Sequence, residues 1–162
     1  MTNSSKYLEQ FERVKRWYKR FKMIDSGRPH NFPSEYYQDE VYAFFQNCYH
    51  LKDWIKNDNS VGAAATMVEG FINGNKELSL CADICNRKKH LMLTSSRSGK
   101  DPRFGKRDFK LTLEEPEEKK TISVKYSINT SSGPVDAFEL ATKCLQAWKN
   151  FIELNINDEA SA

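Results

Sequence analysis

"SEYYQDEVYAFFQNCYHLKDWIKND", residues 34–58, is the longest stretch of helical periodicity in the chain. Its aromatic and aliphatic residues recur at three- and four-residue spacing, which is typical of an α-helix. They occupy more than one face, so this helix is predicted to lie at the centre of the fold with other elements packed around it. The preceding loop, residues 26–34, contains two prolines, and Ser34 is predicted to cap the helix.

The same periodicity predicts four further helices. Residues 5–25, 59–75 and 76–93 each carry an apolar stripe, and the third helix ends near an Asn-Gly pair. The last helix is expected to begin with Pro134 in its first turn, where the missing N–H costs nothing. Asp136 and Glu139 then favour its N-terminal dipole.

A β-hairpin is predicted between the fourth and last helices. Residues 109–115 and 121–129 alternate apolar and polar side chains on either side of the charged turn "PEEKK". The predicted fold class is therefore mainly α: an antiparallel helical bundle of four to five helices with a hairpin, about residues 108–129, inserted before the last helix. Residues 1–162 are expected to form one domain with a frayed tail at 157–162.

Composition narrows the class of protein. Apolar residues make up 39% and aromatic residues 12%, enough for a core without metal or disulfide. The net charge of +3 does not by itself indicate a nucleic-acid binder. No signal sequence or membrane-length apolar segment is seen, which predicts a cytoplasmic protein without membrane contact. The four cysteines lie on apolar stripes and are predicted to be buried, reduced thiols.

Charge is concentrated locally in the first helix. Seven basic residues accompany only two acidic ones between residues 6 and 22. Such a face attracts RNA, anionic lipid or an acidic partner. The alternative is a solvated face whose long side chains cover apolar surface.

Two polar stripes form the candidate site. At 100° per residue, one stripe of the fourth helix and one of the second each hold a histidine and an aspartate. They comprise Ser79, Asp83, Asn86 and His90, and Ala43, Gln46, His50, Asp53 and Asn57.

If the stripes meet, carboxylates would orient the imidazoles for acid–base chemistry near neutral pH. The predicted catalytic residues are His90, His50, Asp53, Asp83 and Asn86, and the predicted substrate-binding residues are Lys89, Arg87, Arg97, Lys100 and Arg103. Two alternatives stay open: the stripes are solvated faces or a polar packing layer, or His50, Asp53, Asp83 and His90 bind a metal. No metal or cofactor is predicted. The loop "SRSGKD" lacks the other residues of a phosphate-binding loop, and its serines are predicted to be ordinary loop residues.

The helical organisation and the segment "DICNRKKH", residues 83–90, resemble the HEPN superfamily of small α-helical bundles. This resemblance implies RNA or nucleotide binding, a homodimer and, in active members, metal-independent ribonuclease activity. His90 matches the histidine of the HEPN ribonuclease motif. Arg87 stands only three residues before His90, whereas the motif's arginine precedes its histidine by four to six.

Two functions follow as hypotheses. The first is an HEPN-like protein, a homodimer as that resemblance implies, whose two stripes line a cleft for RNA or a nucleotide. The second is a non-catalytic module for protein–protein interaction or dimerisation, in which the polar stripes specify packing.

Overall fold

The structure, a computed structural model, describes residues 5–90, 95–114 and 119–157, without the side chains of residues 88–90, 113–114 and 119. The described chain is mainly helical, with a small antiparallel sheet. Its elements are α1 (Lys6–Ser26), α2 (Ser34–Lys56), the 3₁₀ turn η1 (Asn59–Val61), α3 (Ala64–Gly74), α4 (Lys76–His90), β1 (Arg103–Glu114), β2 (Lys119–Thr130), β3 (Gly133–Asp136), α5 (Ala137–Ile152) and the π-helical turn η2 (Glu153–Asn157).

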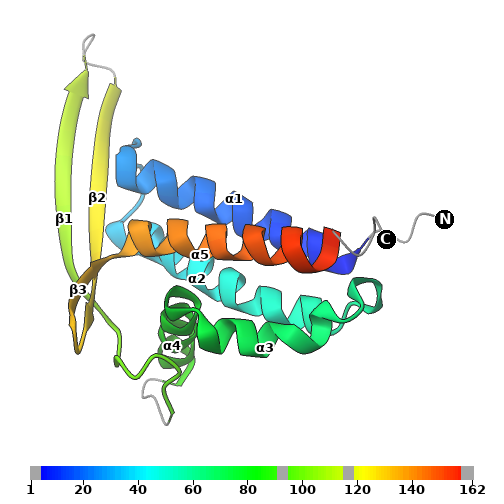
Figure 1. The fold of residues 1–162 in the computed structure, drawn as a ribbon. Helices are drawn as coiled ribbons and strands as arrows, with labels where there is room; N and C mark the ends of the chain where they lie inside the picture. The colour runs from blue at the N-terminus through cyan, green and yellow to red at the C-terminus, as the bar shows by residue number, and fades with distance from the viewer. Residues whose placement is uncertain (1–4, 91–94, 115–118, 158–162) are drawn as a thin grey trace.

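The sheet stands at one end of the helices (Figure 1). Helices α1, α2 and α5 lie side by side, and α4 is seen nearly end-on because it runs across them. Helix α1 begins, and α5 ends, at the end of the molecule away from the sheet. The hairpin of β1 and β2 extends past the helices, so part of it is not covered by them.

Helix α2 packs against each of the other four α-helices, in agreement with its apolar residues on more than one face. An aromatic cluster fixes its contact with α1 and α5: the ring of Phe21 lies 6.1 Å from both Phe44 and Phe45 and 5.3 Å from Phe138. Trp148 of α5 is fully buried, and its indole N–H donates to the Cys48 carbonyl at 3.1 Å. One continuous core therefore joins these three helices.

The predicted hairpin is confirmed, and its strands are longer than the sequence indicated. β1 pairs with β2 from Arg103↔Asn129 to Glu114↔Lys119, with a bulge between Phe104 and Arg107. Residues 116–118 of the predicted turn lie outside the described residues, as do residues 158–162 of the predicted frayed tail and residues 91–93 of the predicted fourth helix.

The start of the last helix was predicted wrongly. Pro134 does not lie in its first turn but pairs with Asn129 in β3, a short strand at the edge of the sheet. An edge strand tolerates proline because one side of its backbone needs no donor. The helix begins at Ala137, where the Asp136 carboxylate accepts the Glu139 N–H at 2.7 Å. Likewise Ser34 is the first residue of α2 and makes no capping hydrogen bond.

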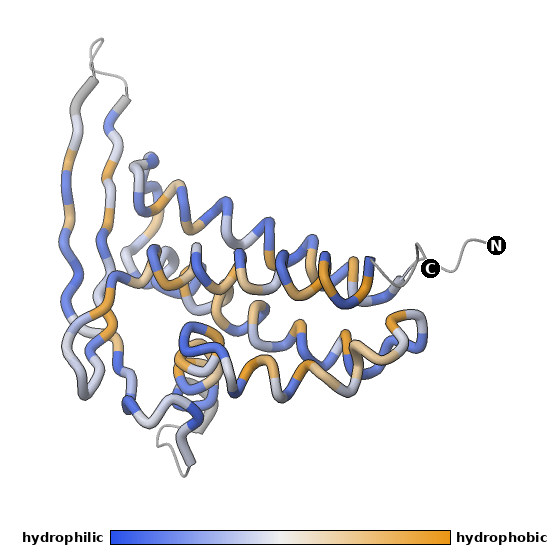
Figure 2. Tube along the Cα trace, in the orientation of Figure 1, coloured by the Kyte–Doolittle hydropathy of each residue, from blue (hydrophilic) through white to orange (hydrophobic). Residues whose placement is uncertain are grey.

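The loop after α1 attaches the sheet to the helices. Arg28 and Ile122 exchange two backbone hydrogen bonds, of 3.2 and 2.8 Å, and Lys125 pairs with Asp25 at 2.6 Å. Hydrophobic and hydrophilic residues alternate along the helices and the hairpin (Figure 2). Among the described helices, none combines the length and apolar character needed to cross a membrane.

Trp148 offers a test of this core. We expect Trp148→Ala to lower the free energy of unfolding by about 3–5 kcal/mol, because it leaves a large cavity between three helices. Trp148→Phe, which keeps most of the volume but leaves the Cys48 carbonyl without its donor, should cost about 1–2 kcal/mol. Urea unfolding followed by circular dichroism measures both values. Tyr36→Ala, at an exposed position, is the control, and an unchanged midpoint for Trp148→Ala would contradict this packing.

Candidate functional site

Asp83 is the centre of the candidate site, and it is completely buried. Its carboxylate is surrounded by the loop that follows α4. It accepts the backbone N–H of Arg97 at 2.8 Å and of Ser98 at 2.9 Å, and the hydroxyl of Ser96 at 2.7 Å. The Ser98 hydroxyl donates a further hydrogen bond. Four donors satisfy the hydrogen-bonding capacity of this buried carboxylate, and they fix the course of the loop.

The side chain of Arg97 connects the same loop to α2 and α3. Its guanidinium donates to Glu69 and to Asn73, both at 2.9 Å, and lies 5.8 Å from the centre of the Tyr49 ring. The backbone of Arg97 is thus held by Asp83 of α4 and its side chain by α3. Arg97 was predicted to bind substrate, and the structure gives its guanidinium three internal acceptors, on Glu69, Asn73 and Tyr49.

Glu69 joins three cations into a network. Its carboxylate accepts from Lys52 at 3.3 Å and Lys56 at 3.0 Å, in addition to Arg97. Burial by itself would raise the pKa of Glu69, but hydrogen bonds from Lys56, Arg97 and Lys52 outweigh it and lower that pKa to about 2. The same Lys52 pairs with Asp53 at 3.0 Å. Through Lys52, Glu69 and Arg97, Asp53 is linked to the loop that Asp83 holds.

The histidines have no part in this network among the described side chains. His50 is exposed, with its ring 6.4 Å from the ring of Tyr49, and no hydrogen bond between it and Asp53 or Asp83 occurs in the described chain. Asn86 is half-buried. His90 ends α4, but its side chain lies outside the described residues. The approach of the two imidazoles therefore stays a prediction.

The remaining predicted substrate-binding residues are dispersed. Arg87 and Arg103 both pair with Asp101, Arg103 at 3.5 Å. Lys100 lines a different hollow, of about 310 Å³, at the starts of α4 and α5. The side chain of Lys89 is outside the described residues. The structure does not gather this set around one point.

A cavity does open between α2 and α4, where the two predicted stripes were expected to meet. Its volume is about 250 Å³. Ala43 and Gln46 of the predicted α2 stripe line it, facing Ile84 and Cys85 of α4, and Asp39, Tyr42 and Phe45 complete the wall. Neither His50 nor Asp83 is among these lining residues, so the cavity adjoins the predicted site without containing its histidine–carboxylate chemistry.

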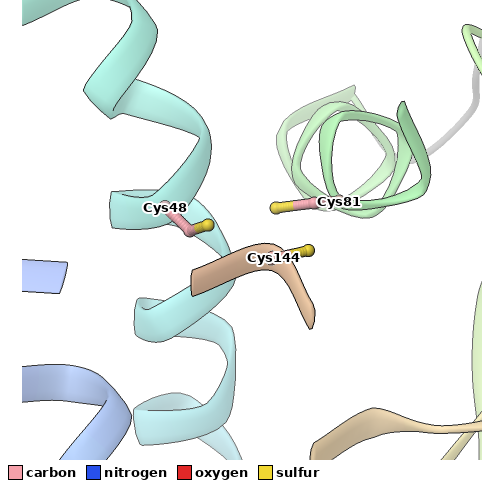
Figure 3. Close-up of side chains that lie close together, drawn as sticks. All are labelled: Cys48, Cys81 and Cys144. Carbon is pink, nitrogen blue, oxygen red and sulfur yellow. The ribbon is translucent and has the colours of Figure 1, made fainter. Parts of the chain in front are cut away.

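Three cysteines converge in the core, which the sequence did not reveal. Cys48 of α2, Cys81 of α4 and Cys144 of α5 point toward one another (Figure 3), and their sulfur atoms lie within 4.8 Å of one another. All four cysteines are free and buried, as predicted. The thiols of Cys81 and Cys144 donate to the carbonyls of Phe45 and Glu77, both at 3.4 Å.

The three thiols do not share one protonation tendency. Hydrogen bonding to Cys144 and Cys48, together with burial, raises the pKa of Cys81, and burial raises the pKa of Cys144. Burial would also raise the pKa of Cys48, but hydrogen bonds with Cys144, Cys81 and Trp148 outweigh it and lower that pKa to about 5. Three thiolates would suit a soft ion such as Cu(I), whereas structural zinc takes four ligands. Within the described chain no fourth His, Cys, Asp or Glu completes the group. The cluster is therefore best described as three packed thiols at a three-helix junction.

Basic and aromatic side chains gather on α1. A hollow of about 460 Å³ is lined by Arg13, Arg16, Trp17, Lys19 and Arg20, which we call the α1 surface. The Arg20 guanidinium lies 4.9 Å from the centre of the Trp17 ring, and that of Arg13 lies 5.6 Å from the Trp54 ring of α2. The surplus of cations was visible in the sequence; the flanking position of Trp54 was not.

No protein-family profile, curated protein sequence or solved structure was found to match the chain. The resemblance to HEPN proteins thus rests on the segment of residues 83–90 and on the helical organisation alone.

Asp83 can be tested by removing its charge. We expect Asp83→Asn to lower the free energy of unfolding by about 2–4 kcal/mol, because buried N–H and O–H donors lose an anionic acceptor. The variant should also be cleaved faster by trypsin at Arg97 or Lys100, because Asp83 no longer anchors the loop that contains them. Asp53→Asn, on the exposed end of the network, should change stability by less than about 1 kcal/mol. Equal stability of Asp83→Asn and wild type would show that the carboxylate does not hold the loop.

The Glu69 network predicts a specific pH dependence. Because the folded-state pKa of Glu69 lies below its unfolded value of about 4.3, its contribution is complete above about pH 5 and is lost as pH falls toward 2. We expect Glu69→Gln to be less stable than wild type by about 1–2 kcal/mol at pH 7, after allowance for solvent screening. That difference should shrink between pH 5 and pH 2.

Chemical unfolding at a series of pH values measures this difference in the free energy of unfolding. The contributions of the carboxylates that both proteins share cancel when the two values are subtracted. Glu35→Gln, at an exposed residue, is the control. A difference between Glu69→Gln and wild type that is constant from pH 7 to pH 2 would contradict the network.

Proposed function

We propose that this protein binds single-stranded RNA through the α1 surface. The observation that carries the proposal is the lining of that hollow: four cationic side chains surround one tryptophan, and no acidic residue contributes to the wall. Phosphate contacts supply affinity and aromatic faces receive bases, which is the combination that single-stranded nucleic acid requires.

The cations of the α1 surface are only partly neutralised within the protein. Arg13 pairs with Glu9 at 2.9 Å, and Arg20 lies 3.9 Å from Glu40. In the described chain, no carboxylate lies within ion-pair distance of Arg16 or Lys19, and both are exposed. These two side chains are therefore the ones most available to phosphate groups.

Both tryptophans beside the basic groups are half-buried, so part of each is accessible. The Arg20 guanidinium lies over the Trp17 ring, and that of Arg13 lies over the Trp54 ring. Charged and aromatic groups therefore alternate across α1 and α2. Trp54 also borders a shallow hollow of about 230 Å³ with Lys6, Asp53 and Asn57. The α2 stripe that was predicted to be catalytic thus ends next to the proposed RNA surface.

The HEPN resemblance supports the same class of ligand. The resemblance implies that the helices form an antiparallel HEPN-like bundle. RNA cleavage stays a prediction, and its predicted residues are His50, Asp53, Asp83, Asn86 and His90. We propose binding without cleavage as the function, because the Asp83 carboxylate is occupied by the loop and supports no imidazole among the described side chains.

The proposal is tested by reversing charge on the α1 surface. We expect Arg16→Glu/Lys19→Glu to weaken binding of a fluorescent single-stranded RNA at least tenfold at low salt. Loss of two phosphate contacts should also reduce the slope of log K against log salt by about 1.4. Trp17→Leu, which keeps an apolar side chain, should weaken binding by about 5- to 150-fold through the loss of one stacked base. Fluorescence anisotropy measures each affinity.

Lys76→Glu/Lys143→Glu is the matched control. It changes the net charge equally, but its two lysines line a hollow that also contains Glu77, Asp136 and Glu139. RNA binding should survive in this variant. The proposal fails if wild type binds no RNA at low salt, or if both double variants lose affinity to the same extent.

A further inference from the structure

The strand β1 has an open edge. In the sheet order β1-β2-β3 it is the first strand, and it lies on the side of β2 away from the helices (Figure 1). In the parts of the chain that the structure describes, no backbone group pairs with its outer edge. A strand of 12 residues with such an edge is a template for a further strand.

Two large apolar side chains of β1 are exposed on the face that packs against the helices elsewhere in the sheet. Phe109 lies opposite Val124, and Leu111 lies opposite Ile122. Opposite residues share a face, yet Val124 is 1% exposed whereas Phe109 and Leu111 are 54% and 59% exposed. The core face of the sheet therefore continues onto β1, where Phe104 packs against the core but Phe109 and Leu111 are exposed.

Alternate residues of β1 direct their backbone N–H and C=O groups toward the free edge of the sheet, and the pairing with β2 identifies these residues. Ile122 exchanges both of its backbone hydrogen bonds with Arg28, on the side opposite to β1. Its partner Leu111 therefore forms a non-hydrogen-bonded pair with it and turns its own N–H and C=O to the free edge. Antiparallel pairing repeats this every second residue, so the outward-directed residues are Arg107, Phe109 and Leu111.

We propose that β1 pairs with β1 of a second copy of this chain, antiparallel and with Phe109 on the two-fold axis. The two three-stranded sheets then form one six-stranded sheet. At this register each Asp108 lies opposite Lys110 of the other copy, the two Phe109 rings meet, and each Leu111 lies opposite Arg107. The interface is isologous, as a two-fold dimer requires.

Charge selects this register over its neighbours. If the axis moved to residue 108, Asp108 would oppose its own copy, and if it moved to residue 110, Lys110 would do so. Moving the axis to residue 107 would oppose two Arg107 side chains and bring the bulge into the pair. Like charges directly opposite one another destabilise strand pairs. Among the registers centred on residues 107–110, these charges therefore favour the one centred on Phe109.

Cross-linking tests the register. Asp108 and Lys110 would form a non-hydrogen-bonded pair with Cα atoms about 4.5 Å apart, within the range of a disulfide. A mixture of Asp108→Cys chains with Lys110→Cys chains should form the mixed disulfide dimer under mild oxidation. Either variant alone should form little, because its cysteines would lie further apart. The four native cysteines are buried and reduced, so they give little background.

Charge exchange tests the interface. Sedimentation velocity over a concentration series should show a monomer–dimer equilibrium for wild type. Asp108→Lys should weaken the dimer by about tenfold or more, because two like-charge pairs replace two opposite ones. The exchange Asp108→Lys/Lys110→Asp should restore it. Glu35→Lys, an equal change of charge at an exposed residue of α2, is the control, and circular dichroism verifies folding.

A monomeric wild type overturns the proposal, as does a dimer that Asp108→Lys leaves intact or a mixed disulfide no faster than the self-linked ones. None of these measurements involves RNA. Failure of the dimer would leave the RNA-binding proposal standing, and failure of RNA binding would leave the dimer.

Discussion

The burial of the Asp83 carboxylate is the constraint on which the second half of the structure depends. A charge without water must be met by donors, and here the backbone and hydroxyls of residues 96–98 supply them. This fixes the chain as it leaves α4, and the Lys100 carbonyl then accepts the backbone N–H of Ser131, in the turn between β2 and β3, at 2.9 Å. The sheet is positioned because the loop before it is anchored at both ends.

Internal pairing of charge determines which basic groups remain for a ligand. Glu69 engages Lys52, Lys56 and Arg97, and Asp101 engages the two arginines near the hairpin. These cations stabilise the arrangement of α2, α3 and the loop. On α1 the balance differs, because seven basic residues accompany two acidic ones between residues 6 and 22. A small net charge therefore conceals one surface with a local excess, and the proposed function rests on that surface.

Apolar groups are buried at the junction of the helices but are left exposed at the free edge of the sheet. At the junction of α2, α4 and α5, three thiols lie close together between the helices (Figure 3), and those of Cys81 and Cys144 donate to backbone carbonyls. On β1, the side chains of Phe109 and Leu111 are exposed, and the backbone groups at the free edge have no strand partner within the described chain. A second copy would supply both at once, and the charges of Asp108 and Lys110 would set its position.

The sequence by itself determined the helices, the hairpin and the burial of the cysteines, because each depends on the spacing of apolar residues along a short segment. It also placed a basic surplus on α1. It could not show that Asp83 turns away from water into a loop 13 residues later, or that Asp53 joins it through Lys52 and Glu69. It assigned Pro134 to a helix because the pairing partner that makes it a strand residue is Asn129, beyond a turn. Periodicity defines the faces of an element, but which faces meet is decided by long-range packing, and only the tertiary structure brought Cys48, Cys81 and Cys144 together.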